Sequence, residues 1–94
     1  MTHPNPRLIE PRFKESIDAF VLHGYQPGGF LTAVMSNDLK EAISRGDESA
    51  LDNLPHIVSY LYNDVPSGAW GSAENVREWR KRHLQIQREF AAEK

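Results

Sequence analysis

Apolar side chains recur every three or four residues in several segments of this 94-residue chain, and this spacing constrains its fold more than any other feature. The first segment follows Pro11, where Phe13, Ile17 and Phe20 fall on one face of a helix. Gly24 gives that helix a natural end. No β-type alternation of useful length is present. We therefore predict an all-α fold, a compact bundle of about four helices.

Two more helices are predicted in the middle of the chain. One spans about residues 28–45 and carries a continuous apolar stripe. The next is harder to place because Pro55 lies within its pattern, and proline removes a hydrogen bond from a helix interior. We predict a short turn over residues 48–53 and a helix over residues 54–63.

A fourth helix is predicted after Ser72, which is a favourable N-cap residue. Its apolar seam has a heptad-like spacing and is too short for a long coiled coil. Such a helix packs on its own domain or pairs in a homo-oligomer, and the sequence leaves both open. The seam consists of Val76, Trp79, His83, Ile86 and Phe90.

The N-terminal segment, residues 1–11, carries three prolines and no periodicity. Because proline fixes φ and removes amide donors, we predict an extended arm there, followed by a single helical domain over residues 12–94. Leu8 and Ile9 are the arm residues expected to pack back on the domain or on a partner.

Composition narrows the classes of function. The chain has no cysteine and no apolar run that could span a membrane, so we predict a cytoplasmic protein without a thiolate metal site. The net charge of −2 argues against binding of nucleic acid by the whole surface. Its four histidines show no metal-ligand spacing, and no nucleophile pattern stands out. We predict a non-enzymatic protein with no cofactor and no metal.

The stretch YQPGGF, residues 25–30, has two interpretations. It is either a plain turn between helices, or a backbone left open so that an anion can approach the first amides of the next helix at Gly28 and Gly29. Asn37 and Asp38 follow as a polar pair beside the apolar stripe. They form either a solvated edge or part of a binding site.

Aromatic and amide side chains gather near the end of the third helix. Tyr60 and Tyr62 point about 200° apart on a helix, so both cannot face the core. Tyrosine and tryptophan beside Asn63 are typical of sites for planar ligands, because they stack and form hydrogen bonds. The alternative is a helix end with Trp70 folded onto the core as a lid.

The last helix is the one candidate basic surface. Residues 74–94 hold six basic and four acidic residues, a net charge of +2. Such a surface contacts phosphates or a protein partner, or is simply a solvated helix face. Its cations are Arg77, Arg80, Lys81, Arg82 and Arg88.

The motifs PGGFL, NDL, YN-x-x-P and WG, which begin at Pro27, Asn37, Tyr62 and Trp70, cover the middle of the chain. In this arrangement the chain resembles a family of small proteins encoded by tailed phages and prophages, to which no activity is assigned. The resemblance implies a setting in the host cytoplasm and a role in host takeover or anti-defence. Proteins of that kind act by binding a host protein or by sequestering a small molecule.

From these patterns we expect a binding protein for a nucleotide-like small molecule or a host protein. The alternative is a protein- or nucleic-acid-contact module that uses the basic helix over residues 73–92. The residues expected to converge on the ligand are Gly28, Gly29, Asn37, Asp38, Tyr62, Asn63 and Trp70.

Overall fold

The computed structural model describes the backbone of residues 3–92 and the side chains of residues 3–86. Within residues 3–92 the chain forms five α-helices, two short 3-10 helices and no β-strand. The predicted all-α class is confirmed, and the predicted count of about four helices is too low. The α-helices are α1 (Pro11–His23), α2 (Gly29–Met35), α3 (Leu39–Arg45), α4 (Glu48–Asp64) and α5 (Ala73–Ala92), and the 3-10 helices are η1 (Pro6–Leu8) and η2 (Ser67–Ala69). No helix of this part of the chain is long and apolar enough to cross a membrane.

Helix α1 forms as the sequence predicts. Pro11 occupies its first turn, where the missing N–H is not needed. Phe13, Ile17 and Phe20 are buried on one face. Gly24 ends the helix in the left-handed region, with φ of 73°, and its N–H donates to the Phe20 carbonyl over 2.9 Å. The face and the cap together fix where α1 lies and where the chain leaves it.

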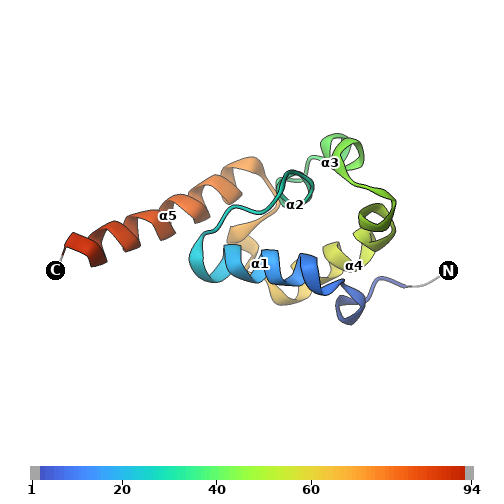
Figure 1. Ribbon diagram of the computed structural model, residues 1–94, viewed down its shortest axis with the longest axis horizontal. Coiled ribbons are helices and arrows are strands. Elements are labelled where there is room, and N and C mark those ends of the chain that lie inside the picture. The colour runs from blue at the N-terminus through green and yellow to red at the C-terminus, as the bar shows by residue number, and fades with distance from the viewer. Residues whose placement is uncertain (1–2, 93–94) are drawn as a thin grey trace.

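The single helix predicted over residues 28–45 is wrong, because the chain breaks it into α2 and α3 (Figure 1). Asn37 adopts a left-handed conformation with φ of 60°, which asparagine tolerates better than most residues. Asp38 then caps α3 by accepting the Glu41 N–H over 3.2 Å. The two residues that are poor helix formers therefore make the corner between two short helices.

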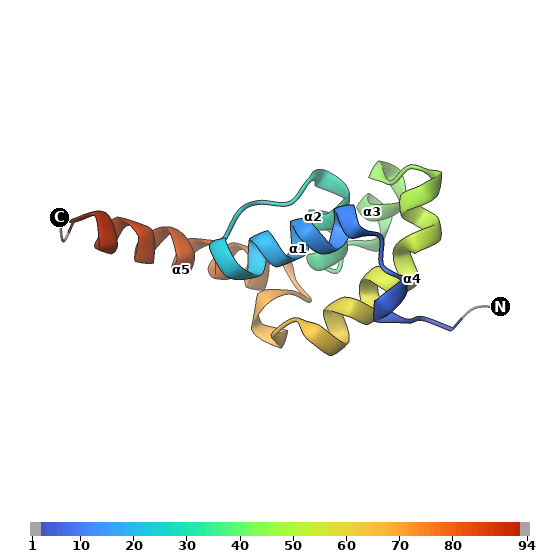
Figure 2. The ribbon, with the colours of Figure 1, turned by 60° about the horizontal axis from the view of Figure 1, so that its bottom comes forward.

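The turn predicted over residues 48–53 is also wrong. Helix α4 begins at Glu48, and the Asp47 carboxylate caps it by accepting the Ala50 N–H over 2.7 Å. Pro55 lies inside the helix and removes one hydrogen bond. Figure 2 shows the course of α4 bending along its length, as proline in a helix causes. Burial of Ile57 and Leu61 after the bend compensates for the lost bond.

The N-terminal segment is docked on α4, which corrects the prediction of an extended arm. It forms η1, and Ile9 is buried with 7% exposure, while Leu8 stays 49% exposed. Asn53, the buried polar residue on α4, holds the backbone on both sides of Ile9. Its Nδ2 donates to the Leu8 carbonyl over 3.0 Å, and its Oδ1 accepts the Glu10 N–H over 2.9 Å.

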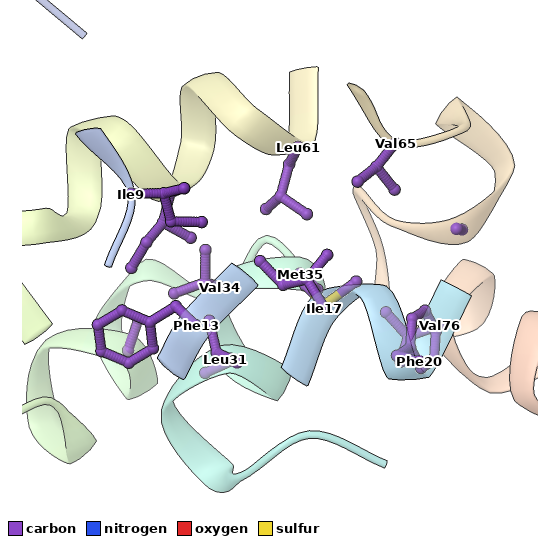
Figure 3. Close-up of a cluster of buried hydrophobic side chains, with 14 of the residues drawn as sticks. Ile9, Phe13, Ile17, Phe20, Leu31, Val34, Met35, Leu61, Val65 and Val76 are labelled. Carbon is purple, nitrogen blue, oxygen red and sulfur yellow. The ribbon is translucent and has the colours of Figure 1, made fainter. Parts of the chain in front are cut away.

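The core lies between α1, α2 and the inner face of α4. Figure 3 shows Ile9 entering it from the N-terminal segment, with Leu61 and Val65 pointing toward the side chains of α1 and α2. Rings also pack across elements, since Phe13 of α1 and Phe30 of α2 have centroids 5.7 Å apart. The largest fully buried side chains are Phe20, Ile17, Met35, Ile57 and Leu61.

Helix α5 starts as predicted and then leaves the body. The Ser72 hydroxyl caps it by accepting the Asn75 N–H over 3.0 Å. Trp79 Nε1 donates to the Val21 carbonyl of α1 over 3.2 Å, so the first half of α5 lies on the domain. The second half extends beyond the rest of the molecule (Figures 1 and 2), whose axes measure 53, 25 and 20 Å. On that half Ile86, from the predicted seam, is 59% exposed, and Phe90 lies outside the described side chains.

Replacement of Asn53 by Ala is expected to lower the free energy of unfolding by about 2 kcal/mol, because it leaves the Leu8 carbonyl and the Glu10 N–H without their partner. Urea denaturation measures the loss. Asn63→Ala is the matched control, since Asn63 is an exposed residue of the same helix whose side chain bonds, among the described residues, to Ser59 alone. Equal effects of the two substitutions would show that Asn53 does not hold the segment.

Replacement of Gly24 by Ala is expected to destabilise the fold by about 2 kcal/mol, also measured by urea denaturation. A Cβ at Gly24 would sit in the left-handed region and only 2.5 Å from the His83 Cβ of α5. The control is Gly28→Ala, where φ is −62° and no other atom lies within 4 Å of the new carbon. That variant should stay within about 0.5 kcal/mol of the parent. A loss at Gly28 as large as that at Gly24 would contradict this account.

Candidate ligand-binding groove

Two adjoining cavities lie between the 24–28 loop, α2, α3 and the start of α5, with volumes of about 400 and 200 Å³. They share four lining residues and therefore form one continuous groove, called here the α2–α5 groove. Its combined size suits a small molecule. The shared residues are Gln26, Thr32, Ser36 and Ala73.

The centre of the groove is polar. Thr32 donates its hydroxyl to the Pro27 carbonyl over 3.1 Å, which fixes the side chain and leaves its oxygen able to accept. Gln26 is exposed in the loop, and Ser36 is half-buried at the end of α2. Neither side chain has a hydrogen-bond partner among the described residues. Both can therefore form hydrogen bonds with a bound molecule.

One end of the groove is cationic. Arg77 and Arg80 line the smaller cavity together with the apolar side chains of Phe20 and Val76. Both arginines are exposed, and neither has an ion-pair partner within the described part of the chain. Guanidinium groups without a carboxylate partner attract phosphate or carboxylate groups. This end therefore favours the anionic part of a ligand.

The other end of the groove carries two carboxylates. Asp38 and Glu41 line the larger cavity, as does Arg45. Arg45 Nε donates to Glu41 Oε1 over 2.6 Å, so this arginine is already paired. It lies across Gly29, where an added Cβ would be 3.0 Å from the Arg45 guanidinium. The net charge of these three side chains is −1, in contrast to the two free arginines at the opposite end.

The structure brings together two of the predicted ligand residues, Gly29 and Asp38, which line the same cavity. Gly28 is the N-cap of α2 directly before Gly29 and is exposed. Asn37 is exposed at the corner before Asp38. Arg45 covers Gly29, and the absence of a side chain at Gly29 leaves room for its guanidinium group. This arrangement agrees with the turn interpretation of YQPGGF, which requires no open amides.

The other predicted ligand residues lie outside the lining of this groove. Tyr62 is 79% exposed near the end of α4. Asn63 is exposed beside it and donates to the Ser59 carbonyl over 2.8 Å. Trp70 packs against the core, and its carbonyl accepts from Asn75 Nδ2 over 3.0 Å. Trp70 therefore lies on the core, as the lid interpretation expects, whereas the ring of Tyr62 does not pack against the core.

The alternative basic surface overlaps the groove. Arg77 and Arg80 line it, and Lys81 and Arg82 are exposed elsewhere on α5. Arg88 lies outside the described side chains. Two residues that the sequence assigns to a separate contact surface are thus part of the same groove as Gly29 and Asp38. Among the described residues no three His, Asp or Glu side chains are close enough to hold one metal ion.

Tyr60, the half-buried tyrosine of α4, takes part in a charged cluster outside the lining of the groove. Its hydroxyl donates to Asp18 of α1, and Lys14 Nζ donates to the same carboxylate over 2.8 Å. Burial and the hydrogen bond to Asp18 raise the pKa of Tyr60 to about 12. Burial acts to raise the pKa of Asp18, but the bonds from Lys14 and Tyr60 prevail and lower it. The cluster ties α1 to α4.

Comparison with known proteins identifies no relative of this chain. No family model, no curated protein and no solved structure matches the chain. The resemblance to the phage-encoded family therefore stays a prediction.

The stability of the protein is expected to fall as the pH rises from about 10 toward 12, with a contribution from Tyr60 that Tyr60→Phe removes. The unfolded chain loses a tyrosine proton near pH 10, and the folded chain holds it to about 12, so deprotonation favours unfolding in that window. Urea denaturation at several pH values measures the slope. Tyr25→Phe, which changes an exposed tyrosine, is the control. Identical slopes for the parent and Tyr60→Phe would contradict the assignment.

Proposed function

We propose that this chain is a binding protein whose α2–α5 groove takes a small, nucleotide-like molecule. The observation that carries the proposal is the pair Arg77 and Arg80, exposed and without ion-pair partners in the described part of the chain, at one end of a groove with an apolar floor. Arginine binds phosphate oxygens through two parallel hydrogen bonds. In this proposal Arg77 and Arg80 bind the phosphate of the ligand.

The rest of the groove supports a ligand with a planar or polar body. Phe20, which is fully buried, and Val76, which is 7% exposed, form the apolar base of the smaller cavity next to the arginines. Gln26, Thr32 and Ser36 offer hydrogen-bonding groups in the centre. Apolar lining with a few placed polar groups is typical of small-molecule sites. These groups hold and orient a molecule, so the proposal is binding and not turnover.

The biological role proposed is that of a phage-type accessory protein in the host cytoplasm, acting in host takeover or anti-defence by sequestering such a molecule. This role rests on the resemblance of the motifs around Pro27, Asn37, Tyr62 and Trp70 and on no contact in the structure. The groove supports the part of the proposal that concerns the ligand.

A second candidate function is contact with a protein partner or a second copy through α5. The observation that favours it is the half of α5 that extends beyond the body, where Leu84 is 41% and Ile86 59% exposed. Lys81 and Arg82 add cations on the same helix. Apolar and cationic groups together suit an acidic partner, and nucleic acid is the weaker form of this alternative because the net charge of the chain is −2.

Mononucleotides are expected to raise the melting temperature of the purified protein by roughly 10 °C at 100 times the dissociation constant, because they bind only the folded state. The double substitution Arg77→Ala with Arg80→Ala should abolish this shift. The matched control, Lys81→Ala with Arg82→Ala, removes the same charge from the same helix outside the groove lining and should keep it.

Two other results would contradict this assignment. A shift that both double variants lose would assign binding to the general charge of α5 and would favour the contact surface. Such binding should also weaken steeply with salt. No shift with any mononucleotide would overturn the proposed function.

A further inference from the structure

Helix η1 lies against one face of α4 (Figure 2), at a distance from the α2–α5 groove. The residues of this face recur every fourth position, so they share one side of the helix. The first two line a cavity of about 670 Å³ together with Leu8, and the last two line a cavity of about 520 Å³ together with Pro6 and Arg7. Helix η1 is therefore a wall of both cavities. The face consists of Asp52, His56, Tyr60 and Asp64.

Burial contributes little to holding η1 in place. None of its three residues is buried, and Leu8 is 49% exposed. The chain just after η1 is held by burial of Ile9 and by the two hydrogen bonds of Asn53. Within the described residues, one hydrogen bond joins the stretch before Leu8 to α4, and it runs from the Asn5 N–H to His56 Nδ1 over 3.1 Å. The position of residues 3–7 therefore depends on this bond.

The bond to His56 exists in only one protonation state of the ring. Nδ1 accepts the Asn5 N–H only when it carries no proton, so the neutral ring holds its proton on Nε2. The charged ring has an N–H at both nitrogens and accepts no hydrogen bond. Its Nδ1–H would face the Asn5 N–H, and two donors cannot bond to each other. Histidine gains this proton from solvent between about pH 8 and pH 5.

The surroundings of His56 offer the charged ring another partner. Asp52 lies one turn before it on the same face of α4, Glu48 lies one turn before Asp52, and all three line the same cavity. Neither carboxylate has an ion-pair partner among the described residues. Protonation thus replaces a bond to Asn5 with an attraction to Asp52. The other titratable groups that line the two cavities are Arg7, Glu10, Lys14, Tyr60 and Asp64, of which Glu10, Lys14 and Tyr60 already have partners.

We propose that His56 is a pH-operated latch for the N-terminal segment. The neutral ring holds residues 3–7 on α4, and the protonated ring releases them and forms an ion pair with Asp52. Asn53 does not titrate, so it keeps the chain on both sides of Ile9 in place in either state. Release removes Pro6 and Arg7 from the wall of the 520 Å³ cavity and uncovers the middle of the polar face of α4.

Backbone ¹⁵N relaxation at about pH 8 and about pH 5 tests the latch. The order parameters of the Asn5 and Arg7 amides are expected to fall from about 0.85, the value of rigid backbone, to below about 0.6, the value of flexible chain. The Glu10 amide, which Asn53 holds, should keep its value. The midpoint of the fall should coincide with the titration of His56, followed through its ring resonances.

His56→Asn separates the charge of the ring from its hydrogen bond. The amide oxygen of the new side chain stands where Nδ1 does relative to Cβ and accepts at either pH, so the Asn5 amide should stay ordered. His3→Asn is the matched control, because it removes an exposed histidine of the same segment and should keep the fall.

Three results would overturn the latch. They are an Asn5 amide that stays ordered in the parent at about pH 5, a midpoint that departs from the titration of His56, and the same loss of order in His56→Asn as in the parent. Each of them leaves the proposed function of the α2–α5 groove in place, since the latch lies outside the groove lining.

Discussion

The hydrogen bond from the Gly71 N–H to the Met35 carbonyl, 2.7 Å long, is the contact on which the groove depends. It joins the end of α2 to the entry of α5, two segments far apart in the sequence. Met35 is fully buried, so its carbonyl is held by the core, and Gly71 is fixed to it. Because Ser36 follows Met35 and Ala73 begins α5, this bond sets the distance between the two walls of the groove. The arginines of α5 are thereby placed beside the polar residues of α2.

The fold could be predicted where local signals agreed with packing. Helix α1 has an apolar face, a proline in its first turn and a glycine cap, and each of these acts within a few residues. The break at Asn37 could not be predicted from the apolar stripe, because the stripe continues past it with Leu39 and Ile43. Both of these side chains are exposed in the structure, and α3 buries Ala42 alone. Pro55 led to a wrong prediction for the opposite reason. The sequence shows the hydrogen bond that proline removes from α4, but burial of Ile57 and Leu61 after the bend outweighs that loss.

The candidate site could be predicted only in part. Gly29 stands out because glycine marks a turn, and Asp38 stands out as part of a polar pair beside an apolar stripe; both line the groove. Thr32 and Ser36 carry no such signal, since small polar residues occur on every helix surface. Only the packing of α5 on α2 places Arg77 beside them. Tertiary structure thus combines residues that the sequence assigned to two rival surfaces.

The central claim is that a small nucleotide binds between α2 and α5, and titration of the ¹⁵N-labelled protein with GMP, followed by amide chemical shifts, tests it most directly. The account predicts perturbations at the amides of residues 26–41 and 73–80, which form the walls of the groove, with little change along η1 and the first half of α4. Absence of any perturbation, or perturbations confined to η1 and α4, would contradict it.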